Sequence, residues 1–408
     1  MKNVAALQKV ATLLKHHNQE LLIVVSAMGK TTNTLESIVA LSQEKKSITS
    51  EINLLKAYHY EIADVLFEKN NTIKAELDRF FNQIEVEAIK NEDYDQVYDQ
   101  VVSLGEVIST LILSRYLTKM GIDNEWIDAR KFISTDNNFR EGKVDWDITK
   151  QQTQKLHDIL KKKIIITQGF IGSTSEGLTT TLGREGSDFT AAIFGSCLNA
   201  ESVTIWKDVP GVMNADPKRL PAATVFKELP FREAAEMTYY GASVIHPKTI
   251  KPLANRGIPL FVKNFDNPAL AGTKIHECKI DQLPPLIVFK DNQCLISCKV
   301  TDYTFIDEHH LGAIFHALSE KNIKVNLMQN SAISFSFCVD FRENKIIGLV
   351  KELSKEFEVY YNTGLTLITI KNYDQKTFNE YRLKHGVVLE QSSRSTLQVL
   401  IKENVLSK

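Results

Sequence analysis

The sequence predicts an α/β protein in which a mostly parallel sheet, with helices on both faces, is followed by a smaller α+β region. Short apolar runs typical of buried strands alternate with helical segments as far as about Ile275. After a linker at Pro284-Pro285 this alternation stops and an internal repeat begins. A chain of 408 residues is too long for one ordinary core, so two to three domains are expected.

The first region opens with apolar residues at helical spacing from Val4 to Leu14. The run Leu21–Val25 is typical of a strand buried on both faces, and the polar loop SAMGKTTN follows it. The later elements are predicted as a long helical region over 51–90, a helix over 94–119, a short strand over 123–128, an amphipathic helix over 149–162, a buried strand over 164–167, a Gly/Ser/Thr-rich stretch over 169–187, a helix to about Asn199 and a strand over 202–206.

The C-terminal region repeats one pattern twice. VNLMQNSAISFSFCV, from Val325, matches VVLEQSSRSTLQVLI, from Val387, with equivalent residues 62 positions apart. Each unit begins with an apolar strand (CLISCKV, then LTLITIK), continues into a helix and returns as a two-stranded hairpin. The second unit is about ten residues shorter and stops without the helix over 344–355 that follows the first hairpin.

Composition excludes several classes of protein. The chain is 43% hydrophobic and 24% charged, as globular proteins are. The net charge of −1 gives no basic field for nucleic acid or an anionic membrane. No apolar run approaches the roughly 20 residues of a membrane span, and the N-terminus does not resemble a signal peptide. The cysteines have no paired metal spacing and are expected to be reduced thiols in the cytoplasm, at Cys197, Cys278, Cys294, Cys298 and Cys338.

The most informative segment is TQGFIGSTSEGLTTTLGREGSD, residues 167–188, with five glycines between a buried strand and a helix. Such a loop lets backbone N–H groups converge on an anion, with help from the helix N-terminus. Arg184, Ser187 and Asp188 stand at the helix start, and an arginine there suits bidentate binding of a carboxylate. The alternative is a flexible surface loop.

Two further segments carry candidate binding groups. IWKDVPGVMNADPK, residues 205–218, leaves a strand end, where open α/β sheets bind nucleotides, so Lys207 and Asp208 are candidates for ATP contacts. The alternative is a plain strand-to-helix connection. In SLGEVIST, Glu106 interrupts an apolar helix stripe, which indicates either a ligand-binding carboxylate or a residue at the edge of the core.

These segments occur in the order found in one enzyme family. VVSAMGKTTN, SLGEVIST, DAR (128–130), TQGFIG, TTTLGREGSDFTAA, IWKDVPGV–ADPK and YYGASVIHP resemble the motifs of aspartate kinases, over essentially the whole chain. The resemblance implies a three-layer α/β/α sandwich of the amino-acid-kinase type, followed by tandem ACT (ferredoxin-like) regulatory domains. It implies transfer of the γ-phosphoryl of ATP, with Mg²⁺, to the side-chain carboxylate of L-aspartate. That reaction begins lysine, threonine, methionine and diaminopimelate synthesis.

The resemblance also implies domain bounds. The catalytic domain is expected over 1–280 and the regulatory domains over 286–408. The first regulatory unit is expected over 292–362. The second is expected over 363–408 and to borrow the strand 286–290, which would nest one unit inside the other. A homodimer through these domains is expected.

Roles follow for individual residues. The substrate-binding set implied by the family is Ser26, Thr32, Glu106, Arg184 and Ser187, with Glu106 on the ammonium group of aspartate. The catalytic set is Asp188, Arg184 and Lys207. The nucleotide set is Lys207, Asp208, Met213, Lys218 and Ser243. Family members often carry Tyr at the position of Met213, Arg at that of Lys218 and Lys at that of Ser243. Because Ser243 replaces this lysine, Lys207 is the candidate cation beside the phosphates.

An end-product amino acid, lysine or threonine, is expected to bind in the first repeated unit, with lysine favoured. The pocket is predicted between the loop from Phe305 to Leu311 and the hairpin that begins near Asn326. Asp307 and Asn326 offer acceptors for an ammonium group, and backbone N–H groups near Leu311 offer donors. Gln329 and Ser331 complete the set. The alternative is ordinary polarity of a loop and a helix cap.

The chain departs from the family at its start, because family members open with a strand and the loop KFGGTS, which holds the β and γ phosphates. Here Met1 already lies in the helix that normally follows. Two explanations are open: the chain starts at an internal methionine of a longer protein, or it is a catalytically impaired paralogue that senses an amino acid. Under either one, the chain as given is expected to have weak kinase activity, although it still binds aspartate. A kinase of the same fold acting on acetylglutamate, glutamate or a nucleotide is a further alternative, which the tandem repeat disfavours.

Overall fold

The computed structural model describes every residue except 16–19, 69–70, 242–243, 303 and 403–408. This part of the chain forms two compact units. One unit consists of Met1–Trp206, Ile245–Phe261 and Lys274–Glu277. The other consists of Lys207–Val244, Val262–Thr273 and Cys278–Lys408.

The first unit contains a parallel sheet of order β1-β3-β2, from Leu22–Val25, Ile164–Gln168 and Asn124–Trp126. Every residue of β3 is buried, which confirms the buried strand predicted over 164–167. The remaining described elements up to β6 are α1 (Val4–Leu14), α2 (Thr31–Gln43), α3 (Thr49–Phe67), α4 (Asn71–Ala88), α5 (Tyr94–Val102), α6 (Leu104–Lys119), η1 (Ala129–Lys131), α7 (Trp146–Thr153), η2 (Gln154–Leu156), α8 (His157–Leu160), β4 (Ile171–Ser173), β5 (Thr179–Thr181), α9 (Gly186–Cys197) and β6 (Val203–Lys207).

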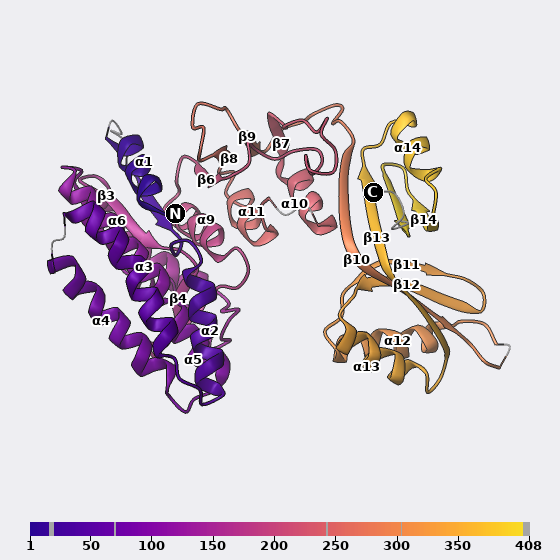
Figure 1. Ribbon diagram of the computed structural model, residues 1–408. Coiled ribbons are helices and arrows are strands. Elements are labelled where there is room, and N and C mark those ends of the chain that lie inside the picture. Colours follow the sequence, from indigo (N-terminus) through magenta and orange to yellow (C-terminus); the bar gives the residue numbers. More distant parts are fainter. Residues whose placement is uncertain (16–19, 69–70, 242–243, 303, 403–408) are drawn as a thin grey trace. The chain divides into compact units, whose positions relative to one another are not determined.

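Helix α6 runs through the core of this unit, with α3 and α4 beside it (Figure 1). The run Tyr94–Lys119 is long and apolar enough to span a membrane, but 89% of its most apolar window is buried inside the protein. The sequence predicts one helix here, whereas the structure has two, α5 and α6, which meet at Ser103. The predicted region 51–90 is likewise two helices, α3 and α4.

The Gly/Ser/Thr-rich stretch is less open than the sequence indicates. Strands β4 and β5 pair antiparallel within it, and all three threonines of β5 are buried. The segment that remains free of strand pairing before α9 is the short turn from Leu182 to Glu185. The expected wide anion loop is therefore a hairpin followed by one turn at a helix N-terminus.

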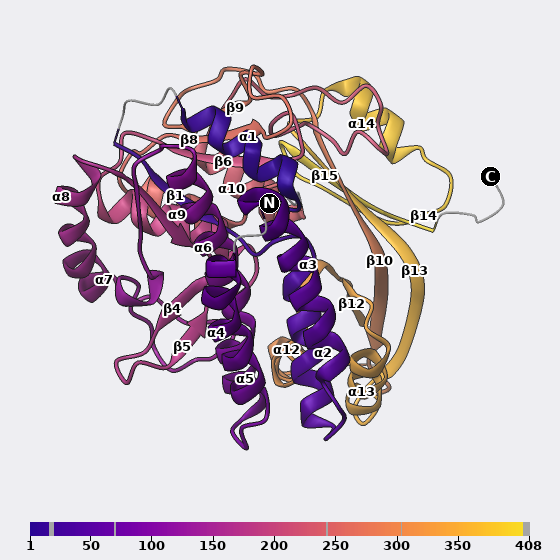
Figure 2. The ribbon, with the colours of Figure 1, turned by 60° about the vertical axis from the view of Figure 1, so that its left-hand side comes forward.

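The second unit is built on a six-stranded antiparallel sheet of order β11-β12-β10-β13-β15-β14. Its two long strands, β10 (Leu286–Lys299) and β13 (Glu358–Lys371), run side by side (Figure 2). The repeated order is strand, helix and hairpin, as predicted: β10 leads to α12 (Glu308–Glu320), β11 (Val325–Asn330) and β12 (Ser334–Asp340), whereas β13 leads to α14 (Gln375–Arg382), β14 (Val387–Ser392) and β15 (Thr396–Ile401). Helix α13 (Glu343–Leu353) follows the first hairpin only.

The early part of β10 pairs with the late part of β13, from Leu286 opposite Lys371 to Lys290 opposite Leu367. The late part of β10 pairs with both β12 and the early part of β13. The domain bounds given above stay predictions.

A four-stranded sheet has the order β6-β8-β9-β7, with β7 at Glu228–Pro230, β8 at Leu260–Asn264 and β9 at Thr273–His276. Helix α10 (Phe231–Tyr240) follows β7, and α11 (Pro247–Ala254) precedes β8. Within the second unit, α10 is tied to the end of β13. The ammonium group of Lys371, whose side chain is 5% exposed, lies 2.8 Å from a Glu233 carboxylate oxygen and also pairs with Glu236.

Candidate active site

The carboxyl ends of β1 and β3 bring candidate residues together in the first unit. Val25 and Gln168 are partners in the parallel register, and the Gly169 N–H donates to the Val25 carbonyl at 3.0 Å. Ser26, which follows β1, is held against α6 because the Ser109 hydroxyl donates to its carbonyl at 2.8 Å. This edge of a parallel sheet is where α/β proteins bind ligands.

Glu106, on the first turn of α6, points at this edge. Its Oε1 accepts from the Ala27 N–H at 3.3 Å, and the side chain is buried. Its Oε2 is also buried, and no described residue offers it a hydrogen bond. Burial raises the pKa of Glu106 to about 8. A buried carboxylate oxygen without a partner is costly unless a ligand satisfies it, so this group is suited to bind a cation such as an amino-acid ammonium.

The start of α2 packs against the start of α6. A β-carbon built on Gly105 would lie 2.9 Å from Thr31 Cγ2 and 3.3 Å from Ala27 Cβ, so glycine permits this approach. The Thr31 hydroxyl lies 3.4 Å from Nε2 of the buried His59, whose Nδ1 lies 2.8 Å from the Leu55 carbonyl. Since Nδ1–H must donate to that carbonyl, Nε2 is the acceptor for Thr31. Thr32, the predicted substrate residue, is the next residue of α2.

The turn before α9 carries the second group of candidates. Arg184 is exposed, Glu185 adopts a left-handed φ of 55°, and Ser187 and Asp188 lie in the first turn of α9. Ser187 touches Gly169, at the end of β3. The N-terminus of α9 therefore meets the same sheet edge as Ser26. Backbone N–H groups and the helix dipole favour an anion there.

A buried carboxylate anchors this turn from behind. Asp99, on α5, accepts hydrogen bonds from the backbone N–H groups of Arg140 and Thr181, each at 2.8 Å, and from the Thr181 hydroxyl at 2.7 Å. Burial raises the pKa of Asp99 to about 6. Thr181 ends β5, three residues before Arg184, so Asp99 fixes the base from which the turn starts.

Two residues of the YYGASVIHP-KT region also lie beside this turn. A β-carbon on Gly183 would be 3.6 Å from the Lys248 ammonium nitrogen. His246 caps α11, and its pKa is lowered, first by burial and then by the charges of Lys248 and Arg184, against the opposing effect of Glu185. Ser243, the predicted nucleotide residue nearby in sequence, lies outside the described residues.

The other nucleotide candidates belong to the second unit. Lys207 ends β6, and its carbonyl accepts from the Phe265 N–H at 2.8 Å. Asp208 follows, and Met213 forms an isolated bridge with Val225. Asp216 accepts from the Lys218 N–H at 2.9 Å and so shapes the loop that carries this exposed lysine. In the described part of the chain, no three His, Cys, Asp or Glu side chains group as a metal site.

The predicted effector residues lie at the β11 end of the second unit's sheet, and several already have partners. Asp307 caps α12, since its carboxylate accepts from the His310 N–H at 3.0 Å. The Asn326 Oδ1 accepts from the Lys290 ammonium at 2.8 Å, and its amide donates to Gln293 and Asp340. Leu311 lies in the first turn of α12, whereas Gln329 and Ser331 are exposed at the end of β11.

Sequence reasoning missed His59, Asp99 and Gln168. A histidine on a long helix and an aspartate beside a tyrosine carry no distinctive spacing, because their partners lie far away in the chain. Gln168 could have been recognised as a candidate, because it is a polar residue at the end of a strand whose other residues are apolar or β-branched.

Comparisons with known proteins agree with this geometry. The family model described as amino acid kinase family matches residues 1–264. Lysine-sensitive aspartokinase 3 of Escherichia coli (strain K12) is 33% identical over 370 residues, which cover 86% of this chain and 80% of that protein. A chloroplastic bifunctional aspartokinase/homoserine dehydrogenase 2 of Zea mays is 30% identical over 378 residues, and the match spans 40% of its length.

Solved structures give the same answer. Escherichia coli aspartokinase III in complex with lysine and aspartate (T-state) has a TM-score of 0.82 at 28% identity, with 98% of this chain and 93% of that chain covered. The same enzyme with aspartate and ADP (R-state) has a TM-score of 0.81 at 29% identity, with the same coverage of both chains. The chain therefore belongs to the aspartokinase family of amino acid kinases.

Proposed function

We propose that this chain transfers the γ-phosphoryl of MgATP to the side-chain carboxylate of L-aspartate and so forms 4-phospho-L-aspartate. The observation that carries the proposal is the unpartnered buried oxygen of Glu106, at the same sheet edge as the N-terminus of α9. A buried acceptor for an ammonium group and a helix terminus for a carboxylate suit a small amino acid. The Escherichia coli relative is named for aspartate and solved with it.

Each residue then has a chemical role. Glu106 receives the ammonium group of aspartate, and Arg184 holds a carboxylate through its planar fork of donors. Ser187 and the N–H groups of α9 assist Arg184, while Ser26 and Thr32 complete the substrate site. Asp188, in the first turn of α9, orients groups around the phosphoryl that is transferred. Phosphoryl transfer depends mainly on positioning and charge neutralisation, which these residues supply.

Lys207, Asp208, Met213, Lys218 and Ser243 are proposed for ATP. Lys207 is the candidate cation beside the phosphates, since Ser243 has no charge. The Mg²⁺ ion is expected to arrive with ATP as part of the substrate. This role is supported by family membership and by the solved relative with ADP.

We also propose feedback inhibition by lysine, bound by the antiparallel sheet of the second unit, and a homodimer formed through that region. The Escherichia coli relative described above is named as lysine-sensitive. Because Asp307 and Asn326 already have partners, lysine binding there requires exchange of those hydrogen bonds. Gln329 and Ser331 are exposed, whereas the Leu311 N–H already donates to the Asp307 carbonyl at 3.1 Å. A cytoplasmic location and the lysine, threonine and methionine pathways remain part of the proposal.

The test is aspartate-dependent release of ADP, measured with a coupled enzyme assay, with glutamate and acetylglutamate as competing acceptors. We expect turnover with aspartate as the acceptor, no turnover with glutamate or acetylglutamate, and inhibition by lysine. Calorimetric binding of L-aspartate is measured on the same protein. A protein that binds lysine but neither binds aspartate nor releases ADP would instead be an amino-acid sensor.

A further inference from the structure

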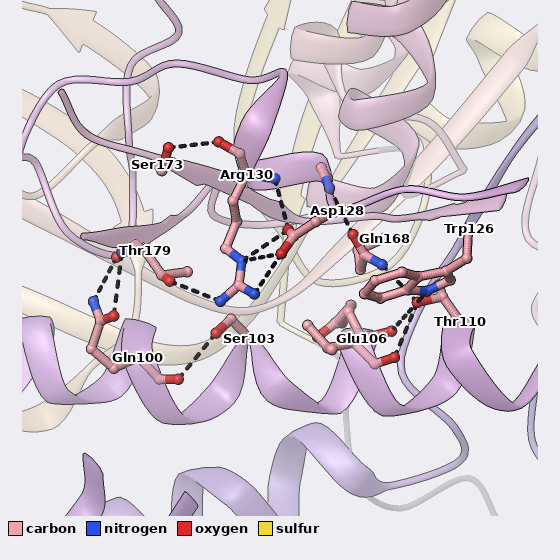
Figure 3. Close-up of polar contacts among 12 residues, drawn as sticks. Gln100, Ser103, Glu106, Thr110, Trp126, Asp128, Arg130, Gln168, Ser173 and Thr179 are labelled. Atoms are coloured by element: carbon pink, nitrogen blue, oxygen red, sulfur yellow. Dashed lines mark hydrogen bonds and ion pairs between the residues drawn. The ribbon is translucent and has the colours of Figure 1, made fainter. Parts of the chain in front are cut away.

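Two buried side chains form a hydrogen-bonded junction between β3 and α6, two elements that position the proposed aspartate site. Gln168 ends β3, and its amide nitrogen donates to the Thr110 hydroxyl of α6 at 2.8 Å (Figure 3). The Gln168 amide oxygen accepts from the Ala129 N–H at 2.7 Å. Both side chains are fully buried, at 0% exposure.

The junction uses all of the hydroxyl's hydrogen-bonding capacity. The Thr110 oxygen accepts from Gln168 and from the Trp126 indole N–H, the latter at 2.9 Å, and donates to the Glu106 carbonyl at 2.9 Å. A threonine hydroxyl has one proton and two lone pairs, so all three are engaged. The Ala129 contact also fixes which end of the Gln168 amide faces Thr110. A buried polar network that is fully satisfied specifies one arrangement of the elements that it joins.

The joined elements are those that carry the proposed substrate groups. Thr110 lies one turn after Glu106 on α6, and its hydroxyl donates to the Glu106 backbone carbonyl, so the junction is attached to the turn that carries this carboxylate. Gln168 is followed by Gly169, which touches Ser187 at the start of α9. The junction thus spans from the proposed ammonium acceptor to the proposed carboxylate-binding helix terminus.

The junction also connects to the DAR motif at 128–130, through the hydrogen bond between Gln168 and the Ala129 N–H. Ala129 lies between Asp128 and Arg130, whose side chains form a two-point ion pair with a shortest distance of 2.7 Å. The Arg130 guanidinium also donates to the Thr179 hydroxyl at 3.3 Å (Figure 3). Thr179 begins β5, the strand that leads into the Arg184 turn.

We propose that Gln168 and Thr110 are positioning residues for aspartate, which hold Glu106 at a fixed separation from Ser187 and the Arg184 turn. Neither side chain is expected to touch substrate. The inference rests on the proposed function, because it requires that these groups bind aspartate. A misplacement of about 1 Å can cost an enzyme about a hundredfold in rate. Aspartate affinity should fall as well, because the groups that bind its two ends are no longer held at the matching separation.

The test is calorimetric titration of L-aspartate, and separately of MgADP, into the full chain and a graded set of variants. Thr110→Val and Gln168→Met keep shape and remove the hydrogen bonds, and each should weaken aspartate binding by about tenfold or more. Trp126→Phe removes one of the three contacts to the hydroxyl and should give a smaller loss. Thr110→Ser keeps the hydroxyl and should bind aspartate within about threefold of the unaltered protein. MgADP binding should remain unchanged in all four.

Thr118→Val is the control for the same substitution at an exposed position of the same helix. The Thr118 hydroxyl also donates to a carbonyl one turn back in α6, at 3.1 Å, and accepts from the Asn124 amide at 3.2 Å, but two turns farther from Glu106. Its loss should leave aspartate affinity unchanged. A double-mutant cycle separates positioning from stability. If Gln168 acts through Glu106, the aspartate losses of Gln168→Met and Glu106→Gln will be strongly non-additive.

Several outcomes would overturn the inference. One is unaltered aspartate affinity in Thr110→Val and Gln168→Met. Another is an equal loss in Thr118→Val, and a third is additivity in the cycle, since these results would mark the junction as purely structural. If Thr110→Val or Gln168→Met fails to fold, the other two variants decide. Trp126→Phe should then bind aspartate more weakly than Thr110→Ser, and the opposite order would contradict the inference. Failure of the unaltered protein to bind aspartate would instead remove the proposed function itself.

Discussion

Gly169 and Ser187 are in direct contact, so that a β-carbon built on Gly169 would lie 2.4 Å from the Ser187 hydroxyl oxygen and 2.7 Å from its Cα. The second distance involves backbone, which cannot rotate away as a side chain can. Glycine at this position therefore allows the N-terminus of α9 to press against the end of β3. This contact explains why the TQGF segment has a glycine at position 169.

Gly169→Ala should push α9 away from the sheet edge. We expect a loss of about 1–3 kcal/mol in the free energy of unfolding, as is usual for overpacking, together with weaker aspartate binding. Gly312→Ala is the control. Gly312 lies in helix α12, and beyond the adjoining helix backbone no described atom lies within 4 Å of the added carbon, so the change should be neutral or stabilising. Denaturant unfolding and aspartate calorimetry measure both. Normal aspartate affinity in Gly169→Ala would show that the contact is not needed for the site.

Aspartate binding should release a proton from Glu106. Its pKa of about 8 means that the carboxyl is mostly protonated at pH 7 without ligand, whereas an ammonium group requires the carboxylate. Aspartate affinity should therefore rise as pH increases from about 6 to 8. Calorimetry in two buffers of different ionisation enthalpy counts the protons, with up to about one expected. The count should fall to zero in Glu106→Gln, and an unchanged count would mean that another group supplies the proton.

His59 should make the protein sensitive to acid. Burial lowers its pKa to about 4, below the unfolded value of 6.5. The folded state therefore disfavours protonated His59. The free energy of unfolding is not reduced by this residue above pH 6.5, and it falls as pH decreases from 6.5 toward 4. In His59→Leu, the free energy of unfolding should depend less steeply on pH across that window. The exposed His385→Gln serves as control and should keep the original slope. Equal slopes in both variants would contradict this account of the acid sensitivity.

Lys371→Met should destabilise the second unit. The substitution leaves Glu233 and Glu236 without their shared partner on β13, which we expect to cost about 1–3 kcal/mol in the free energy of unfolding. Lys299→Met is the control in the same sheet, because the Lys299–Glu358 pair is 3.9 Å long and about half exposed, and such pairs contribute little. Equal stability losses in the two variants, measured with denaturant, would show that burial of the Lys371 pairs is not important.

The sequence predicted the parts of the fold that depend on local patterns. The structure confirms the strands predicted from the apolar runs at β1 and β3 and the strand-helix-hairpin repeat. These elements could be predicted because buried strands are built from apolar residues. Glu106 was a candidate from the sequence because a charged residue on an otherwise apolar helix stripe is easily noticed, and its role in binding stays a prediction. The β4–β5 hairpin was missed because its threonines sit among glycines and serines, which are typical of loops. The break at Ser103 was missed because apolar periodicity continues across it. The His59 and Gln168 contacts join residues 28 and 58 positions apart, and no local pattern encodes such contacts.

The most direct test of the central claim is calorimetric titration of L-aspartate and of MgADP into the unaltered protein and Arg184→Ala. The unaltered protein should bind both ligands. Arg184→Ala should lose about 2 kcal/mol or more of aspartate binding, roughly thirtyfold in affinity, because a charged partner of the carboxylate is removed. MgADP affinity should stay nearly the same. Loss of MgADP binding with aspartate binding intact would contradict the assignment of Arg184, and an unaltered protein that does not bind aspartate would contradict the proposed site as a whole.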